Sequence, residues 1–217
     1  YVRGNIAARQ GHLRSALTYF DEAIEIDPTH VRARLNRTSI HMANEEAQAA
    51  LDDANVLLEL APGLALAKLR KAEANMMLSN WEEAKDDLEQ IVEDSPHHHH
   101  ALTQLASCFM AMDRPEKAEA PLNEALRLAP DHTEAWHQRG LLYLDWAQEE
   151  SALNDFEAAV RCDGNHLGAR LRIAAIHHEA KRFSEALGAW NGVLAIEPDH
   201  TVARRRREEC EMALATV

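Results

Sequence analysis

The sequence predicts an all-α protein, built as a tandem array of about six 34-residue helix–turn–helix repeats and a C-terminal helix. One observation is the spacing of the prolines, which lie one or two 34-residue periods apart: Pro28, Pro62, Pro96, Pro130 and Pro198. Gly164 fills the skipped slot. A second observation is an alanine twelve residues before every slot: Ala16, Ala50, Ala84, Ala118, Ala152 and Ala186. A period that runs without insertion through the chain is typical of repeat architectures.

Each repeat is expected to contain two helices, and the fifth repeat shows the pattern most fully. In TEAWHQRGLLYLDW, Trp136, Gly140 and Tyr143 stand at helical spacing along one stripe. The next stretch, SALNDFEAAVRC, continues the pattern with Ala152 and Phe156. The small residues Gly140 and Ala152 are expected to let the two helices approach closely. Alternating runs of Val, Ile and Thr, which would predict strands, are absent from the sequence.

The period and these residues resemble the tetratricopeptide repeat family. The resemblance implies a right-handed superhelical solenoid, whose first helices line a concave groove and whose second helices lie outside. The expected repeats are residues 1–30, 31–64, 65–98, 99–132, 133–166 and 167–200, followed by a capping helix in 201–217. Because the first repeat lacks its opening residues, we expect the chain to be part of a longer protein.

The fourth repeat differs from the others. Pro121 falls inside its expected second helix and is predicted to bend that helix, whereas Pro115 stands near the helix start, where proline is tolerated. Its first helix also carries no Lys or Arg. We therefore expect the fourth repeat to divide the groove into two parts.

Composition excludes several classes of protein. The chain has 36 acidic and 23 basic residues and a net charge of −13, which argues against nucleic-acid binding. No apolar run approaches the roughly 20 residues of a membrane-spanning helix. Cys108, Cys162 and Cys210 are too few and too far apart for a disulfide framework or a zinc site. Unpaired cysteines favour a reducing compartment, so a cytoplasmic location is expected.

Basic residues nevertheless gather in the first helices, which hold eleven of them against four acidic residues. They are Arg3, Arg9, Arg32, Arg34, Arg37, Lys68, Arg70, Lys71, Arg139, Arg170 and Arg172. An acidic exterior around a basic groove favours an anionic partner. The alternative interpretation is that the second helices are acidic only because they are solvated.

Two register positions predict a peptide-binding groove. Position 6, counted from the first residue of each repeat, is occupied by Asn36, Arg70, Gln104, Gln138 and Arg172. In the family this position faces the groove and holds an extended peptide; amides match peptide groups and arginine matches a carboxylate. Position 12 carries Met42, Met76 and Met110. These methionines are interpreted either as an adaptable apolar strip in the groove or as packing between neighbouring helices.

The first three repeats show a weaker resemblance to the carboxylate clamp of co-chaperone members, which grips the acidic C-terminus of a partner. Asn5, Asn36 and Arg70 match that pattern, but Tyr1 and Leu66 stand where it requires lysines. The basic residues available as substitutes are Arg9, Arg32 and Lys68.

Histidines recur at the last position of most repeats, as His30, His98, His132, His166 and His200. Because they recur once per repeat, they are too far apart to share an ion; they are expected to cap or solvate the turns between repeats, and no metal or other cofactor is predicted. The run His97–His100 lies inside the array and is interpreted in the same register. No motif assembles a nucleophile, a base and an oxyanion site, so the chain is not expected to be an enzyme.

The sequence therefore predicts a non-catalytic protein-interaction module that binds an extended or C-terminal acidic peptide in its groove. Two alternatives stay open. One is a structural scaffold that associates through its outer face or end to end, including as a homo-oligomer. The other is an accessory region of a larger catalytic protein.

Overall fold

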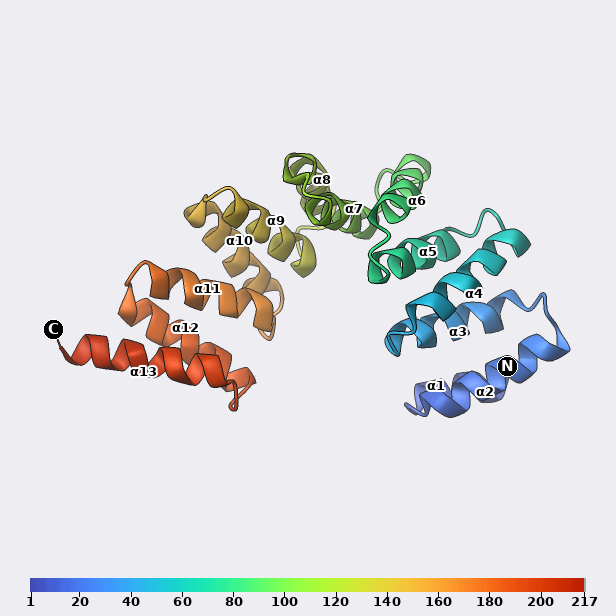
Figure 1. Cartoon of the computed structure of the whole chain (residues 1–217), viewed down its shortest axis with the longest axis horizontal. Coiled ribbons are helices and arrows are strands. Elements are labelled where there is room, and N and C mark those ends of the chain that lie inside the picture. The colour runs from blue at the N-terminus through green and yellow to red at the C-terminus, as the bar shows by residue number, and fades with distance from the viewer. Residues whose placement is uncertain (217) are drawn as a thin grey trace. The chain divides into compact units, whose positions relative to one another are not determined.

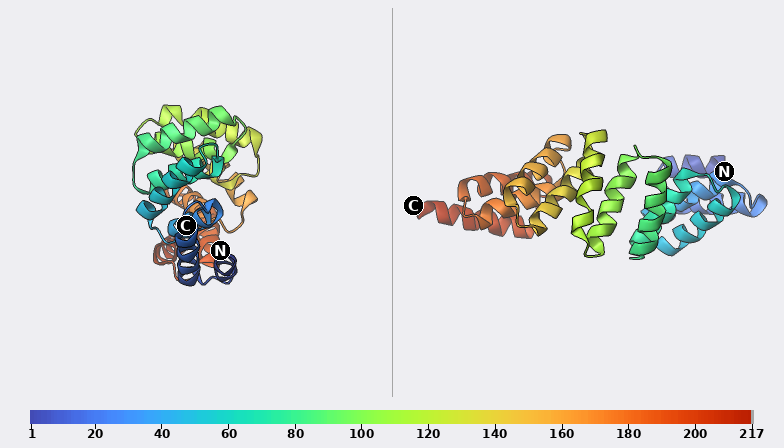
Figure 2. Two further views of the ribbon diagram at one scale, coloured as in Figure 1. Left: turned by 90° about the vertical axis from the view of Figure 1, so that its right-hand side faces the viewer. Right: turned by 90° about the horizontal axis from the view of Figure 1, so that it is seen from above.

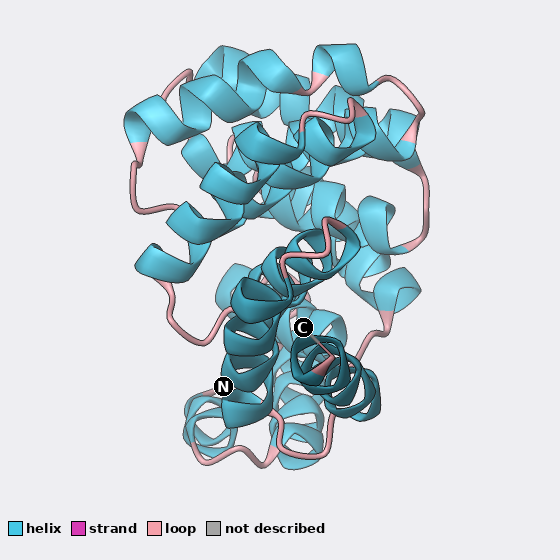
Figure 3. Ribbon diagram, turned by 90° about the vertical axis from the view of Figure 1, so that its left-hand side faces the viewer, coloured by secondary structure: helices cyan, strands magenta, loops and turns pink. Residues whose placement is uncertain are grey.

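The computed structural model describes residues 1–216, which form thirteen α-helices and one short 3-10 helix, without a strand (Figure 3). The first helices of successive repeats are α1 (Val2–Arg9), α3 (Val31–Ala43), α5 (Ala65–Met77), α7 (His99–Ala111), α9 (Thr133–Asp145) and α11 (Leu167–Glu179). The second helices are α2 (Leu13–Ile26), α4 (Ala47–Leu60), α6 (Trp81–Asp94), α8 (Glu119–Leu128), α10 (Glu149–Cys162) and α12 (Phe183–Ile196). The final helix is α13 (Thr201–Ala215). The predicted all-α class is confirmed.

The chain divides into two compact units, one spanning Tyr1–Asp113 with α1–α7, and the other beginning at Arg114 with α8–α13. Within each unit, every helix packs beside the one that precedes it in the chain (Figures 1 and 2). The division falls inside the fourth repeat, between its first and second helices. Among residues 1–216, no helix is both long and apolar enough to cross a membrane.

The second helix of the fourth repeat is shortened rather than bent, so the prediction made for Pro121 is wrong. Pro115–Lys117 forms the 3-10 helix η1, and α8 begins only at Glu119. Pro121 is then the third residue of α8, in a first turn whose N–H groups have no partner within the helix. The missing N–H of Pro121 therefore costs no hydrogen bond. The next residue, Leu122, donates to the carbonyl of Ala118 at 3.2 Å.

Small side chains allow close packing between the helices of a repeat. The six periodic alanines are fully buried. A Cβ atom added to Gly140 would lie 2.6 Å from the Phe156 ring, and one added to Gly4 would lie 2.5 Å from Phe20. The prediction that Gly140 allows a close approach is thus confirmed, with Phe156 as the group that fills the space.

The turn between the two helices of every repeat contains one left-handed residue at position 15. These residues are Gly11, Glu45, Ser79, Asp113, Ala147 and Lys181, with φ between 55° and 76°. In five of these turns the next N–H bonds back to the first helix, as when Glu46 donates to the carbonyl of His41 at 2.8 Å. This pattern is typical of a Schellman helix end. It fixes the direction in which each second helix leaves the turn.

Histidines cap the first helices of the second, fourth and sixth repeats and the final helix α13. The Nδ1 atoms of His30, His98, His166 and His200 each accept a hydrogen bond from the backbone N–H three residues later, at 3.0–3.2 Å. This bond satisfies one of the N–H groups that a helix start leaves free. His132 occupies the same place before α9 without making this bond.

Candidate functional site

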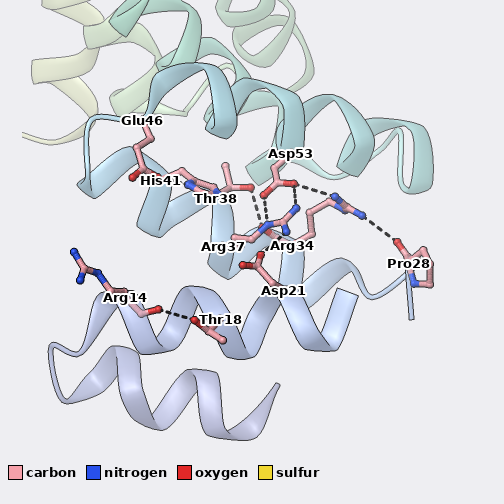
Figure 4. Close-up of polar contacts among 10 residues, drawn as sticks. All are labelled: Arg14, Thr18, Asp21, Pro28, Arg34, Arg37, Thr38, His41, Glu46 and Asp53. Atoms are coloured by element: carbon pink, nitrogen blue, oxygen red, sulfur yellow. Dashed lines mark hydrogen bonds and ion pairs between the residues drawn. The ribbon is translucent and has the colours of Figure 1, made fainter. Parts of the chain in front are cut away.

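Buried ion pairs join the two helices of a repeat, and the second repeat shows the arrangement most fully (Figure 4). Arg37 donates from Nε and Nη2 to Asp53 at 2.8 and 2.6 Å, and from Nη1 to Asp21 of the preceding repeat at 2.6 Å. Arg34 donates to the same Asp53 carboxylate at 2.9 Å and to the carbonyl of Pro28 at 3.2 Å. One buried carboxylate therefore holds two guanidinium groups.

The same sixteen-residue spacing recurs in other repeats. Lys71 donates to Asp87 at 2.9 Å, and Arg139 donates to Asp155 at 2.7 Å. Six of the first-helix basic residues pair with acids in this or a similar way: Arg34, Arg37, Lys68, Arg70, Lys71 and Arg139. Much of the positive charge counted in the first helices is therefore neutralised inside the protein.

Four first-helix arginines remain exposed, with no hydrogen bond or ion pair to another of the described residues: Arg3, Arg9, Arg32 and Arg172. Arg170 is different, because it donates to the carbonyl of Gly164 at 2.8 Å. The capacity of the first helices to bind an external anion thus rests on these four side chains rather than on all eleven.

Arg9 lies at the edge of a cavity of about 460 Å³ in the first unit, formed by α1, α2 and α3. The cavity is lined by Tyr1, Asn5, Ala8, Arg9, Leu13, Phe20, Asn36, Ser39, Ile40 and Ala43. Three residues predicted to bind a peptide, Asn5, Arg9 and Asn36, are therefore brought together here. The sequence patterns did not single out Ser39 or Ile40, which complete the wall.

The cavity is lined by two asparagine amides and one arginine. Asn36 Nδ2 donates to Asn5 Oδ1 at 2.7 Å, which fixes both amides across the two repeats. Both Nδ2 hydrogens of Asn5, the second Nδ2 hydrogen of Asn36 and the Oδ1 atom of Asn36 make no hydrogen bond to another of the described residues. With Arg9 they supply donors, an acceptor and a cation beside the apolar side chains of Leu13 and Ala43. These groups match a peptide end that carries a carboxylate and an apolar side chain.

In a second polar cluster of the first unit, the side chains bind one another. Arg70 donates to Glu73 at 2.6 Å, Gln104 donates to the same carboxylate at 3.1 Å, and His100 lies 3.4 Å from it. Burial raises the pKa of Glu73, but the hydrogen bonds of His100, Arg70 and Gln104 outweigh it and hold this pKa below its usual value. Arg70 and Gln104 were both predicted to bind the ligand. In the structure they bind the Glu73 carboxylate instead.

The sequence analysis did not single out Glu73, although its register offered a signal. Glu73 stands at position 9 of its repeat, the position that Asn5 and Ser39 occupy in the first two. Asn5 and Asn36, two of the residues that match the carboxylate-clamp pattern by position, are joined by a hydrogen bond. Arg70, the third residue that matches the carboxylate-clamp pattern, forms an ion pair with Glu73.

The remaining predicted residues are placed as follows. Gln138 is in the second unit and donates to Glu134 at 2.6 Å. Arg172 is exposed in the same unit, and Arg32 is exposed on α3. The methionines of position 12 are half-buried, which is compatible with both interpretations given above: Met42, Met76 and Met110.

Cys108 and Cys210 are buried, whereas Cys162 is exposed. All three are free thiols. Burial raises the pKa of Cys108 to about 11. Burial likewise raises the pKa of Cys210, whose Sγ lies 3.4 Å from His178 Nδ1. Because the thiolate is the nucleophilic form, these buried thiols are unsuited to nucleophilic catalysis at neutral pH.

Comparison with known families gives three matches, each to a model described as a tetratricopeptide repeat. They cover residues 1–65, 75–139 and 133–166, which together make up most of the chain. No curated protein matches the chain in sequence.

Solved structures resemble this chain at low sequence identity. The Cut9–Hcn1 hetero-tetramer of APC/C contains a chain with a TM-score of 0.82 and 18% identity, over 95% of this chain and 41% of its own length. A tetratricopeptide repeat protein from Parabacteroides merdae has a TM-score of 0.77 and 20% identity, over 96% of this chain and 81% of its own. YrrB, described as having an unusual peptide-binding site, has a TM-score of 0.60 and 23% identity, over 87% and 97%. At these identities the likeness is one of fold.

Proposed function

The chain belongs to the tetratricopeptide repeat family, whose members serve as protein-interaction modules, and we propose that this one binds the acidic C-terminus of a partner. The proposed site is the cavity of the first unit, and the proposed role is non-catalytic. Asn5 and Asn36 bind the peptide backbone, Arg9 binds a carboxylate, and Leu13 and Ala43 contact an apolar side chain.

One observation carries this proposal: Arg9 is exposed and unpaired at the cavity that also holds the Asn5–Asn36 pair. A guanidinium with no internal partner loses less on binding a carboxylate than one that must first leave its own ion pair. Arg70 is in the second situation, because Glu73 already holds it. We therefore assign the binding of the peptide carboxylate to Arg9 rather than to Arg70.

The description of YrrB supports a peptide as the ligand. That protein shares the fold and is described as having a peptide-binding site. Cavities that combine an apolar wall with a few polar groups are typical ligand sites. Here the mixture of two amides and one arginine favours an extended chain end over a small apolar molecule.

The proposal is tested with an array of C-terminal peptides, each prepared with a free carboxylate and as the amide. Peptides with acidic ends are expected to bind to the wild-type chain, and the amides are expected to bind more weakly. Arg9→Glu should weaken binding about tenfold to a hundredfold, because it removes a charge-assisted hydrogen bond and adds a repulsive charge.

Arg3→Glu is the matched control. Arg3 lies on the same helix and is also exposed and unpaired, but it does not line this cavity. Equal losses in the two variants would show that only the net charge of the protein matters. Equal binding of wild type and Arg9→Glu would refute the proposed site.

A structural scaffold is the second candidate function, and exposed apolar side chains favour it. Val2 and Ile6 on α1 are 67% and 52% exposed, and Met212 on α13 is 63% exposed. Contacts between copies of the chain would cover such residues. Light scattering over a concentration series separates the two functions, because a scaffold gains mass with concentration and Ile6→Ser reduces that gain.

A further inference from the structure

Three possible metal ligands meet in the second unit, away from the proposed peptide cavity. Glu134 and His137 are three residues apart on α9 and therefore share one face of this helix. His166 stands at the N-cap of α11. One ligand atom from each of these residues lies within 4.8 Å of the other two. The sequence analysis excluded a shared site because it compared only histidines at the same register position.

The two imidazole rings are held in place by packing. Their centroids lie 4.8 Å apart, and the side chains of His137 and His166 are only 17% and 19% exposed. A Cβ atom at Gly168 would lie 3.2 Å from His137 Nε2, so the glycine at this position leaves room for the pair. The rings are therefore fixed close together before any ligand binds.

The first repeat contains an equivalent pair of packed rings, in which one of the two imidazoles is replaced by a tyrosine ring. Tyr1 and His30 occupy the same register positions as His137 and His166, and their centroids are also 4.8 Å apart. Ring packing alone is thus compatible with tyrosine at this place. The fifth repeat differs by having a second imidazole and a carboxylate beside it.

The ligand atoms already face one another. Glu134 Oε1 lies 3.9 Å from His137 Nδ1, and Glu134 Oε2 lies 3.9 Å from His166 Nε2. His137 Nδ1 is buried and has no hydrogen-bond partner among the described residues. Gln138 donates to Glu134 at 2.6 Å and so orients the carboxylate.

We propose that Glu134, His137 and His166 bind a zinc ion. Two imidazole nitrogens and one carboxylate oxygen supply three ligands of a tetrahedral zinc site, with water as the fourth. Ligand atoms around such an ion lie about 3.3 Å apart. The present separations therefore close by small side-chain rotations. The ion would link the first helices of the fifth and sixth repeats.

Zinc binding at His166 has a distinctive structural consequence. Its Nδ1 atom now accepts the capping hydrogen bond from the N–H of Ala169 at 3.0 Å, so the neutral ring carries its proton on Nε2. Coordination through Nε2 moves this proton to Nδ1, and the capping bond is lost. The Ala169 amide is therefore expected to report zinc binding, although it is not itself a ligand.

The test is a zinc titration of the full chain by calorimetry and by NMR of the histidine side chains and backbone amides. The wild-type chain should show saturable 1:1 shifts of the His137 and His166 rings together with the Ala169 amide. The run His97–His100, in which His97 and His99 are exposed, can also bind zinc adventitiously. It is present in wild type and variants alike, so the difference between them isolates the proposed site.

Three conservative variants test the ligands. His137→Tyr reproduces the Tyr1–His30 ring pair, His166→Asn keeps a side-chain acceptor at the N-cap, and Glu134→Gln keeps the shape of the carboxylate. Each should keep the helical circular dichroism of wild type and weaken zinc binding at this site at least tenfold. If wild type and all variants bind zinc alike, or the wild-type shifts are confined to His97–His100, the proposed site is wrong. The wild-type NMR result decides the matter even for a variant that fails to fold.

Discussion

At the scale of single residues, Asp53 is the group on which the charge balance of the second repeat depends. Its carboxylate is buried and accepts hydrogen bonds from both Arg34 and Arg37. Asp53→Asn leaves the buried Arg34 guanidinium without its counter-charge and leaves Arg37 with Asp21 alone. Because breaking a buried ion pair leaves an uncompensated buried charge, we expect a loss of about 3–5 kcal/mol in the free energy of unfolding. Urea unfolding followed by circular dichroism measures this loss.

Asp86→Asn is the control for this substitution. Asp86 pairs with Lys85 at 2.8 Å, but its side chain is 69% exposed. Removing a surface ion pair costs about 0–1 kcal/mol. A similar effect of the two substitutions would contradict the role assigned to the buried carboxylate.

Glu73 gives the first unit a stability that depends on pH. Its pKa is lower in the folded protein than the ordinary value of 4.5, because the hydrogen bonds of His100, Arg70 and Gln104 outweigh burial. The unfolded chain therefore binds this proton first as the pH falls. The stabilisation is fully present above pH 4.5 and is lost as the pH falls through the folded pKa.

Glu73→Gln tests this dependence. The variant has no carboxyl group to titrate, so its urea midpoint should fall less steeply than that of wild type between pH 6 and pH 3. Glu89→Gln, which changes an exposed residue of α6, serves as the control. If the urea midpoints of wild type and Glu73→Gln fall in parallel with pH, the role assigned to the Glu73 carboxylate is wrong.

At the scale of elements, the left-handed residue of each turn is a site where glycine is expected to stabilise the fold. Ala147 and Lys181 have φ of 55° and 57°, a conformation that is costly for residues with a Cβ atom. After allowance for the greater freedom of glycine in the unfolded chain, Ala147→Gly should stabilise by about 0.5–1 kcal/mol. Gly11→Ala makes the reverse change in the first repeat and should destabilise it. Thermal unfolding measures both effects, and a loss of stability in Ala147→Gly would contradict the assignment.

The packing of Gly140 against Phe156 predicts a compensating pair of substitutions. Gly140→Ala places a Cβ atom 2.6 Å from the Phe156 ring and should cost about 1–3 kcal/mol in stability. The third repeat has Ala72 and Leu88 at these two positions. Gly140→Ala combined with Phe156→Leu should therefore recover part of the loss. A double-mutant cycle by urea unfolding measures the coupling, and additive effects would contradict direct packing.

The helices and their order were predictable from the sequence because the 34-residue period is carried by residues with direct steric roles. The periodic alanines are fully buried, and prolines or Gly164 follow the second helices. The start of α8 was not predictable in the same way. Pro121 is tolerated only because η1 delays the helix until Glu119, and that delay has no signal in the repeat register.

The candidate site was predictable only in part. Register placed Asn5 and Asn36 on neighbouring first helices, and the structure joins them at 2.7 Å. Counting charges by helix could not show which arginines lack an ion-pair partner, because many of the partners lie on other helices. Arg37, for example, pairs with Asp53, sixteen residues away on the next helix. The left-handed turn position was also hidden, because only Gly11 among its six residues is a glycine.

At the scale of the whole molecule, an acidic chain with a net charge of −13 presents few free arginines. Internal pairing leaves Arg9 as the exposed, unpaired arginine at the cavity of the first unit. Long-range repulsion by the acidic surface opposes an acidic peptide, whereas the local contact with Arg9 favours it. Moderate salt screens the long-range term more than the contact, so binding should survive at 0.15 M ionic strength.

The most direct test of the central claim is NMR of the side-chain amides of Asn5 and Asn36 during titration with an acidic C-terminal peptide. The account predicts that these two amides and the Arg9 Nε–H shift together and saturate at one peptide per chain. It also predicts that Arg172 and Gln138, in the second unit, stay unchanged. Shifts confined to the second unit, or an unchanged Asn5–Asn36 pair in the presence of bound peptide, would contradict it.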